Sequence, residues 1–155
     1  MKRLYYLLMA LPMALFVACD NDDQLPEVSM TVDMSGGLKS DGIIYMVQGD
    51  TLSVDSIGVE SLTGKPATLG ATTYYWDTFR VGTLVVAPYS IQFDTGDMPL
   101  GNHLLEIETG IYQVDKTPAY AVMGYKVNIV KDPTDIPSDA VPLPSKPDNV
   151  NVKAQ

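Results

Sequence analysis

The side chains that most often do chemistry in proteins are rare in this 155-residue sequence, which has one cysteine, Cys19, and one histidine, His103. General acid–base catalysis, nucleophile activation and transition-metal binding draw mainly on histidine, cysteine and clustered carboxylates. A single cysteine cannot form a disulfide within the chain. Glycine-rich phosphate loops, paired-histidine zinc spacings and a Gly-x-Ser-x-Gly elbow are also missing from the sequence. We therefore predict a protein that is not an enzyme and has no cofactor.

The remaining groups with chemical potential are two pairs of carboxylates. Glu106 and Glu108 lie two residues apart in a predicted strand, so both project from its outer face and lack the contrasting environments of a glycosidase pair. Asp94 and Asp97 flank a short loop that lacks the length of a twelve-residue calcium loop, and a plain turn is the favoured interpretation. His103 follows a glycine turn, where we expect it to bond to loop backbone. We therefore predict no metal site.

The segment before Cys19 has the order of a signal peptide. Lys2 and Arg3 form a short positive end, and the stretch from Leu4 to Ala18 carries no charge. This stretch is shorter than the roughly 20 residues that a helix needs to cross a bilayer core. It predicts a cleaved signal segment, residues 1–18, in place of a permanent anchor helix.

Phe16, Val17 and Ala18 lead directly into Cys19. This pattern resembles the bacterial lipobox, and the resemblance implies that the Cys19 thiol carries diacylglycerol and that Cys19 becomes the acylated N-terminus of the mature chain. Two or more acyl chains anchor a protein stably to a membrane where one chain is marginal. The alternative is a free or structural cysteine within a cleaved segment.

An acidic cluster, Asp20, Asn21, Asp22 and Asp23, follows Cys19. It resembles the export signal of Bacteroidetes-type surface lipoproteins, which implies a protein anchored in the outer membrane and facing the cell exterior. In enterobacteria an aspartate at this place marks inner-membrane retention instead. A third interpretation is that the acids only keep the tether, residues 19–26, in water. The whole chain has a net charge of -9, which excludes nucleic acid as a partner on electrostatic grounds.

Beyond the tether, residues 27–131 read as seven to nine short strands separated by turns. "EVSMTVDM" alternates apolar and polar residues. In "AYAVMGYKVNIV" one side of the predicted strand carries Ala119, Ala121, Met123, Tyr125, Val127 and Ile129. No helical period is convincing. The pattern predicts an all-β fold, a single antiparallel β-sandwich.

The strand with Tyr74, Tyr75 and Trp76, the turn 98–102 and the long terminal strand together resemble immunoglobulin-like domains, most nearly the bacterial PKD-like kind. The resemblance implies that Trp76 is a structural core residue between the sheets. The sequence departs from the PKD pattern after Trp76, where Asp77, Thr78 and Phe79 replace the usual turn.

Tyrosine is over-represented, with nine tyrosines against three phenylalanines. Its ring is apolar and its hydroxyl can face water or a ligand. We expect Tyr75, Tyr89 and Tyr120 at exposed positions, where they are candidates for ligand binding. The competing explanation is the β-propensity of tyrosine on solvated strand faces.

Residues 132–155 change in composition and form a predicted Pro-rich tail or linker, with five prolines between Pro133 and Pro147. "PSKPDNVNVKAQ" resembles the entry strand of a fibronectin-type or immunoglobulin-like module. Three interpretations remain open: disorder, truncation relative to a longer protein, or pairing of "NVNV" with the sheet edge of another chain.

These observations predict a lipid-anchored protein of the cell envelope that binds without catalysing. Its expected partners are the membrane, through the lipid, and a polysaccharide, as a glycan-binding or uptake accessory module. The alternative is a structural or adhesive spacer that contacts other envelope proteins through sheet edges and the tail.

Overall fold

The computed structural model describes residues 24–143 and 148–152, which form two β-sheets and one short 3-10 helix. Sheet A contains β1 (Val28–Ser35), β4 (Thr51–Ser61), β7 (Ile91–Asp94) and β11 (Asp148–Val152). Sheet B contains β2 (Leu38–Ser40), β3 (Ile43–Val47), β5 (Ala67–Trp76), β6 (Phe79–Leu84), β8 (Gly101–Gln113), β9 (Ala119–Val130) and β10 (Val141–Pro142).

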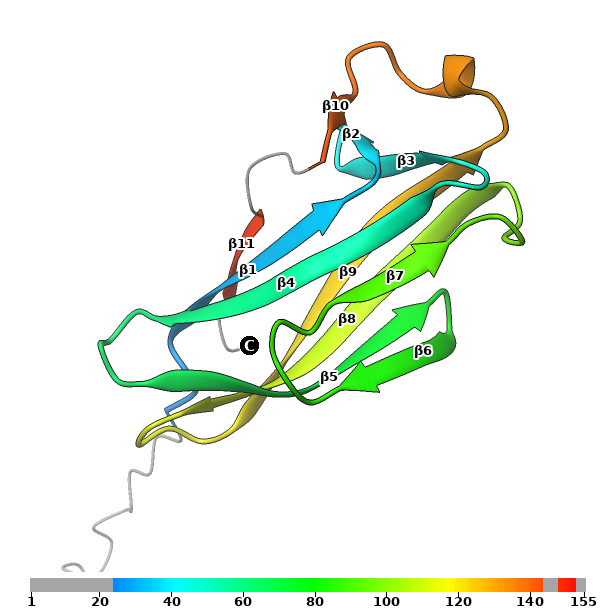
Figure 1. Ribbon diagram of the computed structural model, residues 1–155. Helices are drawn as coiled ribbons and strands as arrows, with labels where there is room; N and C mark the ends of the chain where they lie inside the picture. Colours follow the sequence, from blue (N-terminus) through cyan, green and yellow to red (C-terminus); the bar gives the residue numbers. More distant parts are fainter. Residues whose placement is uncertain (1–23, 144–147, 153–155) are drawn as a thin grey trace, which may run out of the picture.

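The two sheets pack face to face. Figure 1 shows sheet A in front of sheet B, with the long strands of both sheets running in similar directions. The strand order is β11-β1-β4-β7 in sheet A and β10-β2-β3-β9-β8-β5-β6 in sheet B. Neighbouring strands pair antiparallel except β3 and β9, which run parallel. The prediction of an all-β, immunoglobulin-like sandwich is confirmed by this arrangement.

The chain passes from sheet A to sheet B at Gly36, between β1 and β2. This residue has a φ of +92°, and a Cβ there would lie 2.0 Å from the carbonyl oxygen of Thr51. Only glycine fits a backbone that has both the left-handed conformation and so close a neighbour. After this crossover β3 pairs with β9, so that β3, β2 and β10 extend sheet B on the β9 side.

The core lies between the sheets and is built by strict alternation along the strands. In β1 every second side chain is buried, and the same holds for most of β8 and β9. Trp76 is only 7% exposed, at the position expected for a core residue, and its ring centroid lies 5.3 Å from that of Phe93. Full burial of a large apolar side chain contributes about 1.5–3 kcal/mol. The inner face of sheet B is therefore buried in the core, and its outer face is exposed to solvent.

The tether joins the sandwich at the end where β8 ends and β9 begins. The side chain of Gln113 accepts a hydrogen bond from the Glu27 backbone at 2.8 Å, and Lys116 bonds the carboxylate of Glu27 at 2.7 Å. At the other end of β8 lies Gly101, which is about 40 Å away at 3.3 Å per residue. Sheet B therefore has one end next to the tether and one end distant from it.

The tail folds back on its own chain. A short 3-10 helix, η2 (Pro133–Asp135), leads to β10, which pairs with β2, and β11 pairs antiparallel with β1. Figure 1 shows η2 and β10 at the end of the molecule that carries β2 and β3. Both described strands of the tail therefore pair with strands of the sandwich. The "NVNV" segment pairs within its own chain, whereas two of the interpretations of the sequence expected disorder or pairing with another chain.

The predicted lipidation site Cys19 and the acidic residues Asp20, Asn21, Asp22 and Asp23 lie outside the described residues. Within the part of the chain that the structure describes, no helix has the length and apolar character to cross a membrane.

Candidate ligand-binding face

The outer face of sheet B exposes large apolar side chains along β8 and β9. We call the set of Leu104, Tyr112, Tyr120 and Val122 the outer stripe. Tyr120 is 73% exposed, Val122 58%, Tyr112 47% and Leu104 39%. Register places Tyr112, Tyr120 and Val122 together, because Gly110 opposes Tyr120 and Tyr112 follows Gly110 by two residues on the same face. Leu104 lies farther along β8, where it opposes Lys126. Clustered exposed apolar side chains on one face are the usual mark of a binding surface.

Glycines beneath the outer stripe make it flat. A Cβ at Gly70 would lie 2.6 Å from the Tyr112 ring, and one at Gly110 would lie 3.3 Å from it. The ring therefore lies across the backbone of β5 and β8. Leu104 similarly approaches the position where Gly124 lacks a side chain, at 3.6 Å. The arrangement is a low platform with an aromatic ring lying over bare backbone.

Polar groups line the platform along β5 and β8. Glu106 pairs with Gly124 across the strands, and Glu108 pairs with Val122, so both carboxylates are immediate neighbours of the outer stripe. The Tyr75 hydroxyl donates to Glu108 Oε2 at 3.3 Å. A ligand lying on the stripe would therefore meet apolar surface on β9 and hydrogen-bond acceptors on β8.

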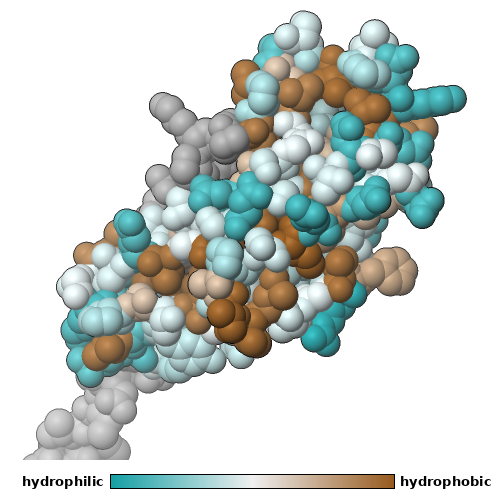
Figure 2. All heavy atoms as spheres, in the orientation of Figure 1, coloured by the Kyte–Doolittle hydropathy of each residue, from teal (hydrophilic) through white to brown (hydrophobic). Residues whose placement is uncertain are grey.

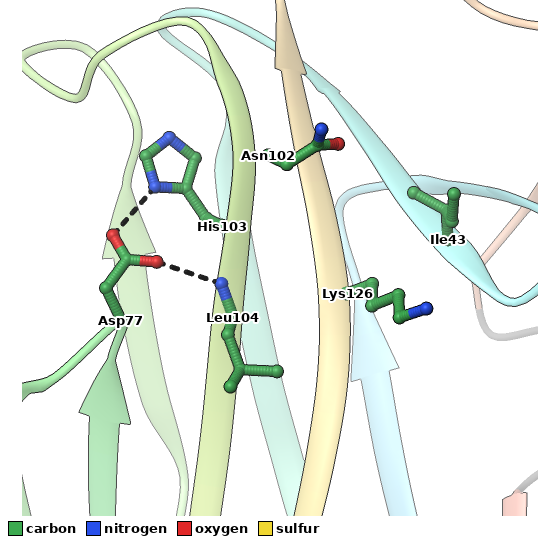
Figure 3. Close-up of a pocket in the computed structure, with 6 residues that line it drawn as sticks. All are labelled: Ile43, Asp77, Asn102, His103, Leu104 and Lys126. Carbon is green, nitrogen blue, oxygen red and sulfur yellow. Dashed lines mark hydrogen bonds and ion pairs between the residues drawn. The ribbon is translucent and has the colours of Figure 1, made fainter.

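At the end distant from the tether, the stripe runs into a depression of roughly 530 Å³. Leu104 belongs to both, because it also lines the depression. The other lining residues are Ile43, Asp77, Asn102, His103 and Lys126. Figure 3 shows Lys126 extending toward Ile43, while His103 and Asp77 face one another on the other side of β8. The depression is open to solvent and places donors and acceptors next to apolar surface.

His103 is held at both ring nitrogens. Nδ1 lies 2.9 Å from Asp77 Oδ2, and Nε2 lies 2.8 Å from the carbonyl oxygen of Pro99. Both partners only accept hydrogen bonds, so a neutral imidazole, with one N–H, could satisfy only one of them. The Trp76 ring packs beside the imidazole, with ring centroids 5.5 Å apart. No ring nitrogen is left to act as a base or metal ligand, and the contact of His103 with loop backbone matches the expectation.

The surroundings of this pair shift both pKa values toward the charged forms. Burial lowers the pKa of His103, but its bonds to Asp77 and to the Pro99 carbonyl outweigh burial and raise the pKa above 6.5. Burial similarly raises the pKa of Asp77, but the bonds from His103 and from the Leu104 amide, 3.0 Å from Asp77 Oδ1, bring it below 3.8. Asp77, with a φ of +56°, is thereby tied to β8 at the turn between β5 and β6.

We expect this pair to make stability depend on pH. The raised pKa of His103 contributes stability that is complete below pH 6.5 and is lost as pH rises through the folded-state pKa. The lowered pKa of Asp77 contributes stability that is present above pH 3.8 and is lost in acid. Urea unfolding should show a decline in stability from pH 6 to pH 8.5 that is smaller in Asp77→Asn. Equal slopes in the two proteins would contradict the assignment.

The predicted tyrosines occupy three different environments. Tyr120 is exposed within the outer stripe, and Tyr75 is half-buried on the same face beside Glu108. The expectation for Tyr89 is wrong: it is only 7% exposed, its hydroxyl donates to the Leu69 carbonyl at 3.1 Å, and its own carbonyl accepts the Tyr74 hydroxyl. The loop after β6 turns inward, so Tyr89 is a core residue and offers no surface to a ligand.

Sequence reasoning missed Tyr112, Leu104 and Val122. Tyr112 lies beyond the predicted strand that contains Glu106 and Glu108, although the alternation continues through Gly110 and Tyr112. The signal that could have found it is a tyrosine two residues after a glycine in a strand, since aromatic rings often cover strand glycines.

A second group of exposed apolar side chains lies at the β6 edge. Phe79, Val81, Val85 and Val86 are exposed, and Figure 2 shows hydrophobic side chains gathered over β6 and the loop that follows it. The pairing of β5 and β6 shifts register at Tyr74 and Tyr75, which leaves Val81 as a bulge. Such bulges protect an edge strand from pairing. This edge lacks the flat backbone and adjacent carboxylates of the outer stripe.

Among residues 24–143 and 148–152, no group of three or more histidine, cysteine, aspartate or glutamate side chains is placed to hold a metal ion. In the Asp94–Asp97 loop, Asp94 Oδ1 accepts the Gly96 amide at 2.8 Å, which is the bond of an ordinary turn. Comparisons with protein-family models, curated proteins and solved structures found no significant match.

Proposed function

We propose that the protein is a lipid-anchored binding module of the outer cell surface, which presents the outer face of sheet B to a polysaccharide. The observation that carries the proposal is the outer stripe itself: Tyr112 lying over Gly70 and Gly110, next to exposed Tyr120 and Val122. Sugar rings have flat apolar faces and a rim of hydroxyls. Such a ligand matches a low aromatic platform bordered by carboxylates.

The position of the face relative to the tether supports this function. Lys116 donates a hydrogen bond to Gln24 of the tether at 2.9 Å, and the depression lies at the far end of β8. With Cys19 held in a membrane by its lipid, the stripe would run away from the membrane and end in the depression. A long polymer could then lie along the face without contact with the bilayer.

The competing function is a spacer that contacts envelope proteins through its sheet edges. The edge strand β1 is already paired with β11 of the same chain, and β2 is paired with β10. The outermost strands on this side are therefore the tail strands β10 and β11, and β6 and β7 are outermost on the other side. The spacer function would use these edges, whereas the glycan function uses the outer face of sheet B.

The test compares a glycan screen with a protein pull-down. The Cys19→Ala chain, which keeps every described residue, is run in native gels that contain a mannan, a β-glucan or a dextran, and is also used as bait in envelope extracts. We expect retarded migration in at least one polysaccharide gel. Unretarded migration in all of them, together with specific capture of an envelope protein, would replace the glycan function with the spacer function.

A further inference from the structure

The carboxylates beside the outer stripe distinguish between classes of glycan. Glu106 and Glu108 lie on the outer face of β8, directly opposite Gly124 and Val122 of β9. A polymer in contact with Val122 and Tyr120 would therefore place its substituents next to two carboxylates. Ionised carboxylates only accept hydrogen bonds, so they suit hydroxyl groups and oppose anionic groups.

Two cations lie on the same outer face close to Glu106. Lys126 opposes Leu104 and is two residues from Gly124, the partner of Glu106, while Arg80 pairs with Tyr75, which in turn pairs with Glu106. Glu108 lies one pair farther along the stripe from both cations. Lys126 lies at the end of the stripe, in the depression, and Arg80 lies on β6, where its guanidinium donates to Thr83 at 2.8 Å. Asp77 and His103 form their own ion pair. The chain as a whole has a net charge of -9. A polyanion would be repelled both by the whole chain and by the carboxylates that it would contact.

A hydrogen bond from Tyr75 orients the Glu108 carboxylate on this face. The Tyr75 hydroxyl donates to its Oε2 atom at 3.3 Å, and Tyr75 itself pairs with Glu106 in the neighbouring row. A carboxylate held by one donor keeps acceptor positions for further donors, because each of its oxygens has two lone pairs. Vicinal hydroxyls of a sugar supply such donors.

We propose that the outer stripe selects a neutral, hydroxyl-rich polysaccharide, with Glu106 and Glu108 as acceptors for its hydroxyl groups and as the groups that reject acidic glycans. This inference rests on the proposed glycan-binding function. The depression, with Asp77, Asn102 and Lys126 around it, holds one end of the bound segment. The ligand class is therefore distinguished from uronate-rich and sulfated polymers by charge.

The experiment measures binding of the Cys19→Ala chain to the neutral polysaccharides and to polygalacturonate, at low salt so that repulsion is not screened. The double variant Glu106→Gln, Glu108→Gln keeps the shape of both side chains and removes their charge. Because charge-assisted hydrogen bonds are roughly twice as strong as neutral ones, we expect the variant to bind the neutral polymer about fivefold more weakly. Glu60→Gln, an exposed change on β4 in the other sheet, is the matched control and should bind as the parent does.

The outcomes separate the inference from the function on which it rests. Binding of a neutral polymer by the parent, with no binding of polygalacturonate and a loss in the double variant, supports the inference. Equal or tighter binding of polygalacturonate, or an unchanged affinity of the double variant for the neutral polymer, overturns the charge selection while leaving glycan binding intact. Absence of binding to both classes refutes the glycan function itself.

Discussion

Cys19→Ala is expected to abolish labelling by a radioactive or clickable fatty acid and to leave the protein either unprocessed or in the soluble fraction. In the proposed lipoprotein the membrane affinity would come from the acyl chains, at about 0.8 kcal/mol for each buried methylene. Within the described residues no helix is able to span a membrane and so replace the lipid. Carbonate extraction followed by immunoblotting measures the partition.

Replacement of Asp20, Asp22 and Asp23 by alanine provides the control for this experiment, because it leaves Cys19 in place. The control variant should keep its lipid and remain in the membrane fraction. If the acids direct export to the surface, it should also become protected from protease added to intact cells. Unchanged fatty-acid labelling of Cys19→Ala would contradict the lipoprotein assignment.

The strands of this fold were predictable from the sequence because one face of each sheet is buried. A shift of one residue in β1 or β9 would turn every buried side chain toward water, so burial forces the alternation that the sequence displays. Trp76, which the resemblance to immunoglobulin-like domains places in the core, is buried on β5, a strand with neighbours on both sides. Here local pattern and tertiary packing agree.

The tail was harder to predict because prolines usually exclude sheet pairing. Pro142 lies in β10, where it pairs with Leu38. This is possible because β10 is the outermost strand of sheet B, so the missing amide hydrogen interrupts no inner ladder. Backbone pairing at a sheet edge depends on where the preceding segment directs the chain. Here Asp139 accepts a hydrogen bond from the Ser40 hydroxyl and the Leu143 amide donates to the Gly37 carbonyl, and a sequence pattern does not contain these long-range contacts.

Three of the four residues of the outer stripe, Leu104, Tyr112 and Val122, were likewise not predicted from residue types. Tyr89 and Tyr120 both follow loop-like segments, yet Tyr89 is 7% exposed and Tyr120 73%. Their difference comes from the loop after β6, which turns the Tyr89 ring toward the Leu69 carbonyl. The flatness of the stripe depends on Gly70 and Gly110 being neighbours on adjacent strands, and residues so far apart in sequence become neighbours only once the register of β5 and β8 is known.

The second large effect is expected from the two tyrosines of the outer stripe, Tyr112 and Tyr120. Both are exposed, so truncation to alanine should leave the fold intact, apart from the cover that Tyr112 gives to Gly70 and Gly110. An aromatic contact contributes about 1.4 kcal/mol, which is roughly tenfold in affinity. Removal of both rings should therefore weaken polysaccharide binding by about a hundredfold, if the two contacts act independently.

The measurement that tests this account most directly is the affinity of three proteins for the polysaccharide that the screen identifies. The three are the Cys19→Ala chain, the same chain with Tyr112→Ala and Tyr120→Ala, and the same chain with Phe79→Ala, which removes an exposed ring from the β6 edge. Circular dichroism and thermal unfolding first establish that all three are folded. We predict a loss of about a hundredfold for the double tyrosine variant and parent affinity for Phe79→Ala. Parent affinity in the tyrosine variant, or a comparable loss in Phe79→Ala, would show that the outer face of sheet B is not the binding surface.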